Sequence, residues 1–137
     1  RYIRLLGVSG TRVDSNWFQE VEFRVLDIII TTTGNFTGTT ITAPSSVSEM
    51  GAIITYQDQT GTNALNTDIV LQLSADGGSN YSTATLTALP DFSTGIKMAK
   101  VNDLAVTAGT SLKYKIEFAN QASGSKEARI RGVSLQY

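Results

Sequence analysis

The sequence contains neither cysteine nor histidine. Without cysteine there can be no disulfide, no thiolate metal site and no cysteine nucleophile, and without histidine the usual general base and the Ser-His-Asp arrangement are excluded. No apolar run approaches the ~18 residues of a membrane-spanning helix, so we expect no membrane insertion. Catalysis would have to rest on carboxylates, lysine or tyrosine, and the sequence therefore predicts a protein that is not an enzyme.

Basic residues are also missing from a large part of the chain. Residues 28–96 contain no lysine or arginine, whereas residues 97–137 are rich in both. A basic segment can mark a nucleic-acid surface. These basic residues, however, largely alternate with apolar ones, which is typical of the solvent-facing side of strands, so no nucleic-acid partner is expected. The basic residues are Lys97, Lys100, Lys113, Lys115, Lys126, Arg129 and Arg131.

What is present is an alternation of apolar and polar residues. Residues 111–118, SLKYKIEF, place every second residue on an apolar face, and residues 20–25 and 68–73 do the same. Such alternation predicts half-buried antiparallel strands. We therefore expect an all-β, antiparallel β-sandwich or jelly-roll-like fold of about nine strands. The expected strands are residues 2–8, 18–26, 36–42, 50–57, 67–74, 81–87, 95–101, 111–119 and 127–137.

Two details of strand pairing can be predicted. Residues 95–101 and 111–119 are expected to pair with each other through a loop at 102–110, which contains Asn, Asp and Gly. In the last strand, Ile130 belongs to one phase of the alternation, whereas Val133 and Leu135 belong to the other. The phase changes at Gly132, which predicts a β-bulge there.

The chain divides into three expected parts. Residues 1–27 are either the terminal strands of a jelly roll or the first strands of the same sandwich, residues 28–48 are a Thr-rich edge strand or a linker, and residues 49–137 are a β-sandwich module. The apolar, β-branched run at 28–30 would promote aggregation if exposed. A packed neighbour or a partner subunit is therefore expected to cover it. Because the chain starts within a predicted strand and without methionine, we expect a fragment or a processed product.

The stretch SADGGSNY at 74–81 predicts a hairpin turn, because Asp-Gly between alternating segments supplies the positive φ angles of such a turn. Asp76, Gly77 and Gly78 are interpreted as structural turn residues. The stretch resembles the Asp box of sialidase-like families at Ser74, Asp76, Gly78 and Tyr81. That resemblance implies a structural hairpin in which the aspartate caps backbone N–H groups, rather than a metal or catalytic role for Asp76.

The first residues, RYIRLLGVSGTRVDSNWFQEVEF, resemble the last two strands of discoidin-like (coagulation factor 5/8 type C) jelly rolls. The resemblance is carried by the Arg-Tyr-x-Arg-aliphatic start, by the Asn16-Trp17 loop and by Glu20-Val21-Glu22. A glutamate at Glu20 or Glu22 can help to hold structural calcium in that family. The resemblance therefore implies Glu20 as a candidate metal ligand and calcium as a candidate structural ion; no other cofactor is expected.

The later segments, TDIVLQLSADGGSNYSTATLTAL, GTSLKYKIEFANQ and RIRGVSLQY, look like β-sandwich repeats of structural and tail-fibre proteins of tailed phages. The resemblance implies a non-catalytic virion component, in a tail fibre or as a capsid decoration. Its partners would be further copies of the chain, with a trimer plausible, or other virion proteins, and it could contact a cell-surface glycan. The alternative function is a carbohydrate-binding module of a secreted enzyme or adhesin, located outside the cell.

Candidate ligand residues are few. Trp17, the single tryptophan, and Tyr56 could each offer an aromatic face to a sugar, although packing in the core is the more common role of such rings. Oxygen-bearing side chains in the loop 56–68 could bind calcium, but they lack the order of an EF-hand loop, and a solvated turn is favoured. The oxygen-bearing residues are Asp58, Asn63, Asn66 and Asp68.

Overall fold

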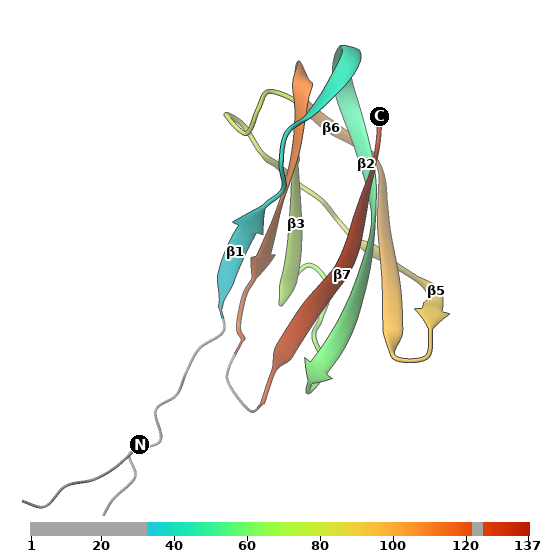
Figure 1. The fold of residues 1–137 in the computed structure, drawn as a ribbon. Helices are drawn as coiled ribbons and strands as arrows, with labels where there is room; N and C mark the ends of the chain where they lie inside the picture. The colour runs from blue at the N-terminus through green and yellow to red at the C-terminus, as the bar shows by residue number, and fades with distance from the viewer. Residues whose placement is uncertain (1–32, 122–124) are drawn as a thin grey trace, which may run out of the picture.

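The computed structural model describes residues 33–121 and 125–137, which form seven antiparallel strands (Figure 1). This confirms the prediction of an all-β, antiparallel protein. The strands lie in one sheet with the order β4-β3-β6-β2-β7, and β1 and β5 also pair with β6. They are β1 Gly34–Thr37, β2 Ile41–Thr60, β3 Ile69–Ser74, β4 Ser82–Thr83, β5 Thr87–Ser93, β6 Ile96–Phe118 and β7 Glu127–Gln136. The described residues include no helix long and apolar enough to cross a membrane.

Strand β6 is the central strand of the sheet, because four other strands pair with it along its 23 residues. These are β1, β2, β3 and β5. The first part of β6 lies between β5 and β2, and its last part lies between β3 and β1. Strand β7 adds to the free side of β2. Every strand except β4 and β7 is therefore hydrogen-bonded directly to β6.

The ribbon formed by β2 and β6 bends. Figure 1 shows β2 rising, turning over at the top of the view and descending. The bend coincides with register shifts between Thr42 and Val47 and again between Val47 and Glu49. Pro44 lies in the first of these shifts, which fits its lack of a backbone N–H to donate to a ladder. The irregularities allow one long strand pair to change direction without ending.

The core lies inside this bend. Ile69, Leu71 and Leu73 of β3 are fully buried, as the alternation predicted, and Val70 and Gln72 point to the other side. Residues from both parts of the bent ribbon belong to the same buried cluster. Burial of a large aliphatic side chain contributes about 1.5–3 kcal/mol, so this cluster is the main source of stability. Its other members include Met50, Ala52, Ile54, Tyr56, Ala99, Val101, Leu112 and Ile116.

The predicted hairpin between 95–101 and 111–119 is wrong, because both segments belong to β6. The intervening residues 102–110 were interpreted as a loop on account of their Asn, Asp and Gly. In the structure these residues lie at irregular positions within the strand. Asp103 has a φ of 48°, and a Cβ at Gly109 would lie 2.2 Å from the carbonyl oxygen of Ala75. Bulges and turns use the same residues because both need unusual backbone angles or close approach.

The count of nine strands is not reproduced. Two of the nine, 2–8 and 18–26, lie outside the described residues. The described residues contain seven expected strands and seven observed ones, but the boundaries differ. The expected strand 36–42 is divided between β1 and β2, the expected strands 95–101 and 111–119 are one strand, and β5 was not predicted. Residues 34–37, 41, 42 and 47 pair with β6, and the boundary expected at residue 48 falls within β2.

The predicted bulge at Gly132 is confirmed. Gly132 pairs with Thr55 and Ile130 pairs with Tyr56, so that Arg131 is the extra residue of β7. A Cβ at Gly132 would lie 3.1 Å from the Thr55 hydroxyl oxygen, which leaves little room for a side chain. The bulge restores the inward phase, since Ile130 and Val133 both pack against the core.

Candidate functional site

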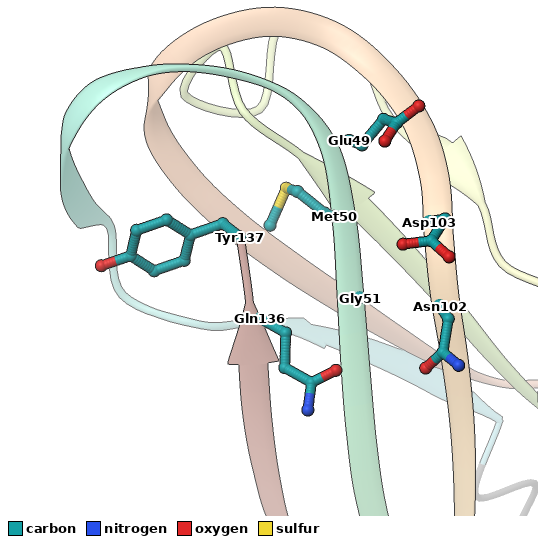
Figure 2. Close-up of a pocket in the computed structure, with 7 residues that line it drawn as sticks. All are labelled: Glu49, Met50, Gly51, Asn102, Asp103, Gln136 and Tyr137. Atoms are coloured by element: carbon teal, nitrogen blue, oxygen red, sulfur yellow. The ribbon is translucent and has the colours of Figure 1, made fainter.

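An open depression crosses three neighbouring strands near the C-terminal end of β7 (Figure 2). Its volume is about 450 Å³, within the range of about 300–1,000 Å³ common for small-molecule sites. Strand β2 forms the middle, β6 one side and β7 the other. The lining residues are Glu49, Met50, Gly51, Asn102, Asp103, Gln136 and Tyr137.

A β-bulge supplies one side of the depression. Met50 pairs with Leu104 and Ala52 pairs with Val101, so Asn102 and Asp103 together lie opposite the single residue between. Bulges of this kind re-aim side chains and are common beside functional sites. Asp103 has a positive φ of 48°, which Asn and Asp tolerate better than most residues. The bulge therefore places an amide and a carboxylate next to each other on the exposed side of β6.

Gly51 forms the floor. It is buried and pairs with Gln136 of β7. A Cβ at this position would lie 3.0 Å from the carbonyl oxygen of Val101 and 3.1 Å from Oε1 of Gln136. The neighbouring strands thus close in on the glycine from both sides, and its missing side chain leaves the hollow above it.

The polar side chains of the depression are free to bind a ligand. Glu49, Asn102, Asp103 and Gln136 are exposed. None of these side chains has a hydrogen bond or ion pair with another residue in the described part of the chain. Figure 2 shows Glu49 and Asp103 on one side of β2 and the Tyr137 ring on the other side, pointing away from them. The depression therefore offers carboxylates and amides, and the exposed Tyr137 ring lies beyond its edge.

The two carboxylates of the depression are accessible from outside the protein. Glu49 and Asp103 both lie open to solvent on adjacent strands. Such groups can accept hydrogen bonds from hydroxyl groups or attract a cation, and the amides of Asn102 and Gln136 can both donate and accept. The arrangement suits recognition of a polyhydroxylated or cationic ligand.

The structure places the aromatic and metal candidates from the sequence elsewhere. Tyr56 is only 5% exposed and belongs to the core, so its ring cannot serve as an open platform for a ligand. Burial also raises the pKa of its hydroxyl. Trp17 and Glu20, together with the run at 28–30, lie outside the described residues.

The 74–81 hairpin has the hydrogen bonds of a structural turn. Oδ1 of Asp76 accepts hydrogen bonds from the Ser74 hydroxyl (2.7 Å) and from the backbone N–H of Asn80 (3.0 Å). Gly77 and Gly78 have φ angles of 79° and 91°. Backbone and side-chain hydrogen bonds from Asn80 hold the pKa of the Asp76 carboxyl at about 2. The carboxylate is thus engaged in stabilising the turn that joins β3 to β4.

The loop expected at 56–68 is not a solvated turn: residues 56–60 belong to β2, and the remainder is tied down by hydrogen bonds. Asn63, Asp68 and Gln121 are 3%, 1% and 2% exposed, and they form a buried polar network. The amide of Asn63 donates to Oδ1 of Asp58 (2.7 Å), and Nε2 of Gln121 donates to Oδ1 of Asn63 (3.0 Å). Asn66 exchanges two hydrogen bonds with the backbone of Leu86. The network ties the loop to the segment before β7.

Both aspartates of this network are paired with lysines. Oδ2 of Asp68 accepts from Nζ of Lys126 (2.8 Å) and from the N–H of Ala64 (2.7 Å), and these contacts lower the pKa of Asp68. Oδ2 of Asp58 accepts from Lys97 (2.6 Å). Burial alone would raise the pKa of Asp58, but the hydrogen bonds from Lys97 and Asn63 outweigh it and the pKa is lowered. The loop oxygens face N–H donors instead of converging on a calcium position.

In the described ranges no three acidic side chains come together as a metal-binding group. The depression itself was not predicted. Its residues are far apart in sequence, and they meet only because β2 lies between β6 and β7. A weak signal did exist, since Asn102 and Asp103 interrupt the alternation after Val101, but it was interpreted as a loop.

No protein-family model, no curated protein and no solved structure matches this chain.

Proposed function

We propose that the chain is a non-catalytic structural and binding module whose depression across β6, β2 and β7 binds a saccharide. The observation that carries the proposal is the group of exposed carboxylates and amides on three neighbouring strands, with the exposed Tyr137 ring at the edge of the depression. Saccharides present hydroxyl groups for hydrogen bonds and C–H faces for aromatic side chains, so this combination matches their chemistry. As part of the proposal, the two parts of the bent sheet act as the layers of a jelly-roll-like sandwich.

The charge of the depression restricts the ligand. Glu49 and Asp103 bring two negative charges, and its lining includes no lysine or arginine. A saccharide with carboxylates of its own would be repelled, because like charges at close range are unfavourable. We therefore expect a neutral or an amino-bearing saccharide.

We place this module in a virion, as part of a tail fibre or a capsid decoration, on the resemblance of residues 67–137 to phage β-sandwich repeats. The saccharide would then belong to a host surface. The alternative is a carbohydrate-binding module of a secreted enzyme or adhesin, which would use the same depression. The solution mass, measured by light scattering at several concentrations, distinguishes the two: a stable trimer or larger closed assembly favours the virion and a concentration-independent monomer favours the module.

The binding proposal is tested by screening the intact chain on an array of neutral, amino-bearing and uronic-acid-containing bacterial oligosaccharides, followed by calorimetry with the best neutral or amino oligosaccharide. Tyr137→Ala should weaken binding about tenfold, which corresponds to loss of about 1.4 kcal/mol of contact. Phe92→Ala is the matched control, because Phe92 is 66% exposed on the distant strand β5. It should leave the affinity unchanged.

Two results would contradict the proposal. One is an array on which no neutral or amino-bearing oligosaccharide binds. The other is a loss of affinity in Phe92→Ala as large as in Tyr137→Ala. Trp17→Phe belongs to the same series: if it abolishes binding and Tyr137→Ala does not, the aromatic platform is Trp17, as the sequence first suggested, and the depression is not the site.

A further inference from the structure

A second surface feature is an apolar groove between β1 and β7, with a volume of about 510 Å³. Its floor is a cluster of aromatic rings from β1 and β6. The Phe36 ring lies 6.1 Å from the Tyr114 ring, at right angles to it, and 6.1 Å from the Phe118 ring. Phe36 nevertheless remains 38% exposed. On the β7 side, Ile130 and Val133 line the groove.

Both strands that border the groove are edge strands within the described residues. β1 pairs only with β6, and β7 pairs only with β2. Each therefore presents an outer row of backbone N–H and C=O groups with no strand partner there. Natural proteins rarely leave such an edge beside exposed apolar side chains, because it is a template for a further strand. An apolar floor flanked by backbone edges suits an extended segment that adds to the sheet.

The chain itself approaches the groove at one end. Thr33, which leads directly into β1, exchanges hydrogen bonds of 3.2 Å with the backbone of Gln121. Oε1 of Gln121 accepts from the N–H of Ala128, at the start of β7 (2.8 Å). The beginnings of β1 and β7 are thus held by one glutamine. A segment that runs toward Thr33 along the groove would be antiparallel to both strands.

The residues that precede Thr33 have the composition such a strand needs. In residues 25–30, VLDIII, only Asp27 is polar, and the rest are aliphatic. Ile30 is four residues from Gly34, a connection that spans at most about 14 Å, enough to turn back along β1. Residues 20–30 carry three acids, Glu20, Glu22 and Asp27, against one base, Arg24, which leaves a net negative charge. Arg129 and Arg131 lie on the β7 side of the groove.

We propose that residues 25–30 of the same chain occupy this groove as an additional antiparallel strand between β1 and β7. The strand covers Phe36, Tyr114 and Phe118 and pairs with the outer backbone of β7. It also gives the run at 28–30 the apolar cover that its sequence requires.

The proposal can be tested by disulfide cross-linking, because the chain has no cysteine of its own and introduced cysteines can pair only with each other. Ile130→Cys is combined in turn with Leu26→Cys, Ile28→Cys and Ile30→Cys in the full chain, and disulfide formation under mild oxidation is followed on non-reducing gels and by peptide mass. At least one pair should cross-link within a single chain in high yield, because facing residues of neighbouring strands have the Cα separation that a disulfide needs. Thr87→Cys on the remote strand β5 replaces Ile130→Cys as the control and should not cross-link.

Two cross-linking results overturn the proposal. A link found only between two chains would mean that a second copy fills the groove, and the absence of any link with Ile130→Cys would mean that residues 25–30 lie elsewhere.

Hydrogen exchange offers a measurement that does not depend on the cysteines. In the variant with Ile28→Ser and Ile30→Ser, the outward-facing amides of residues 129–133 should exchange at least tenfold faster than in the parent chain, because the outer edge of β7 loses its partner. The control carries Val8→Ser and Val13→Ser, which remove apolar surface upstream of the proposed strand, and it should exchange like the parent. Equal exchange in the parent and the Ile28/Ile30 variant would overturn the proposal.

Discussion

Two acidic regions lie nine residues apart along β2 and behave in opposite ways. Around Asp58, every carboxylate oxygen has a donor: Lys97 and Asn63 donate to Asp58. Lys126 and Ala64 donate to Oδ2 of the buried Asp68, and Asn120 donates to its Oδ1. Around Glu49, the carboxylates are exposed and have no protein partner among the described residues. The carboxylates of the first region hold a loop in place, and those of the second region can contact a ligand.

The difference shows that the number of oxygen atoms in a segment does not identify a ligand site. The segment 56–68 has the more suggestive sequence, because Asp58, Asn63, Asn66 and Asp68 lie in one short stretch. Those oxygens are already satisfied, and a buried polar group that is fully hydrogen-bonded has little left to offer a ligand. The lining residues of the depression are scattered along the sequence, yet their side chains are the ones without partners.

The largest expected effect comes from exchanging an aspartate for asparagine in each region. Asp68→Asn should lower the free energy of unfolding by about 2–3 kcal/mol, because the charged hydrogen bonds from Lys126 and Ala64 are weakened and the site is buried. This value is at the low end for a broken buried pair, since the Lys126 side chain is 33% exposed. Asp103→Asn is isosteric and should change stability by less than about 0.5 kcal/mol. Urea unfolding of both variants measures the contrast.

If Asp68→Asn and Asp103→Asn unfolded at the same urea concentration, the distinction between a structural and an available acidic region would be lost. The same pair also separates stability from binding. Asp103→Asn should weaken saccharide binding, whereas Asp68→Asn, assayed well below its unfolding midpoint, should not.

A smaller effect is expected at the floor of the depression. Gly51→Ala puts a methyl group 3.0 Å from the Val101 carbonyl oxygen, and the backbone must shift slightly to accept it. We expect a loss of about 1 kcal/mol in stability and, because the hollow is filled, a loss of saccharide affinity of about tenfold. Gly34→Ala is the control, since a Cβ there meets nothing within 4 Å. Unfolding curves and calorimetry on both variants measure the two effects.

Unchanged affinity in Gly51→Ala would show that the ligand does not reach the floor and would move the site toward the rim. An equal loss of stability in Gly34→Ala would show that the effect comes from replacing glycine and not from the close approach of Val101.

The sequence was sufficient where local pattern decides the structure. The inward set of β3, the turn at Asp76 and the bulge at Gly132 all follow from residues close together in the chain. The sequence was insufficient where the pairing of distant strands decides the structure. Nothing local distinguishes Asn102 and Asp103 in a bulge from the same residues in a loop, because both need the same backbone freedom. Asn102 and Asp103 form a bulge because the partner strand β2 pairs with β6 on both sides of them.

The same reason explains the site. Glu49, Asp103 and Tyr137 are neighbours only through the order β6-β2-β7, which is a property of the sheet as a whole. Tyr56, in contrast, belongs to the inward-facing phase of β2, and the alternation at residues 52, 54 and 56 could have placed it in the core. The burial of Asn63 and Asp68 could not have been found this way, since polar loop residues are usually exposed.

The smallest effect is a pH dependence in the hairpin, where an exposed acid is nevertheless held by the turn. The pKa of Asp76 is about 2 in the folded protein, below the value of about 3.9 of an unfolded chain. Its stabilising contribution is therefore complete above about pH 4 and is lost as the pH falls toward 2. Asp76→Asn should unfold more easily than the parent at pH 6, and the gap should narrow steadily between pH 4 and pH 2. Urea unfolding across this range measures it, with Asp91→Asn, exposed on β5, as the control. A gap that stays constant down to pH 2 would mean that the charge of Asp76 does not stabilise the turn, and that its hydrogen-bonding geometry, which asparagine shares in part, is what matters.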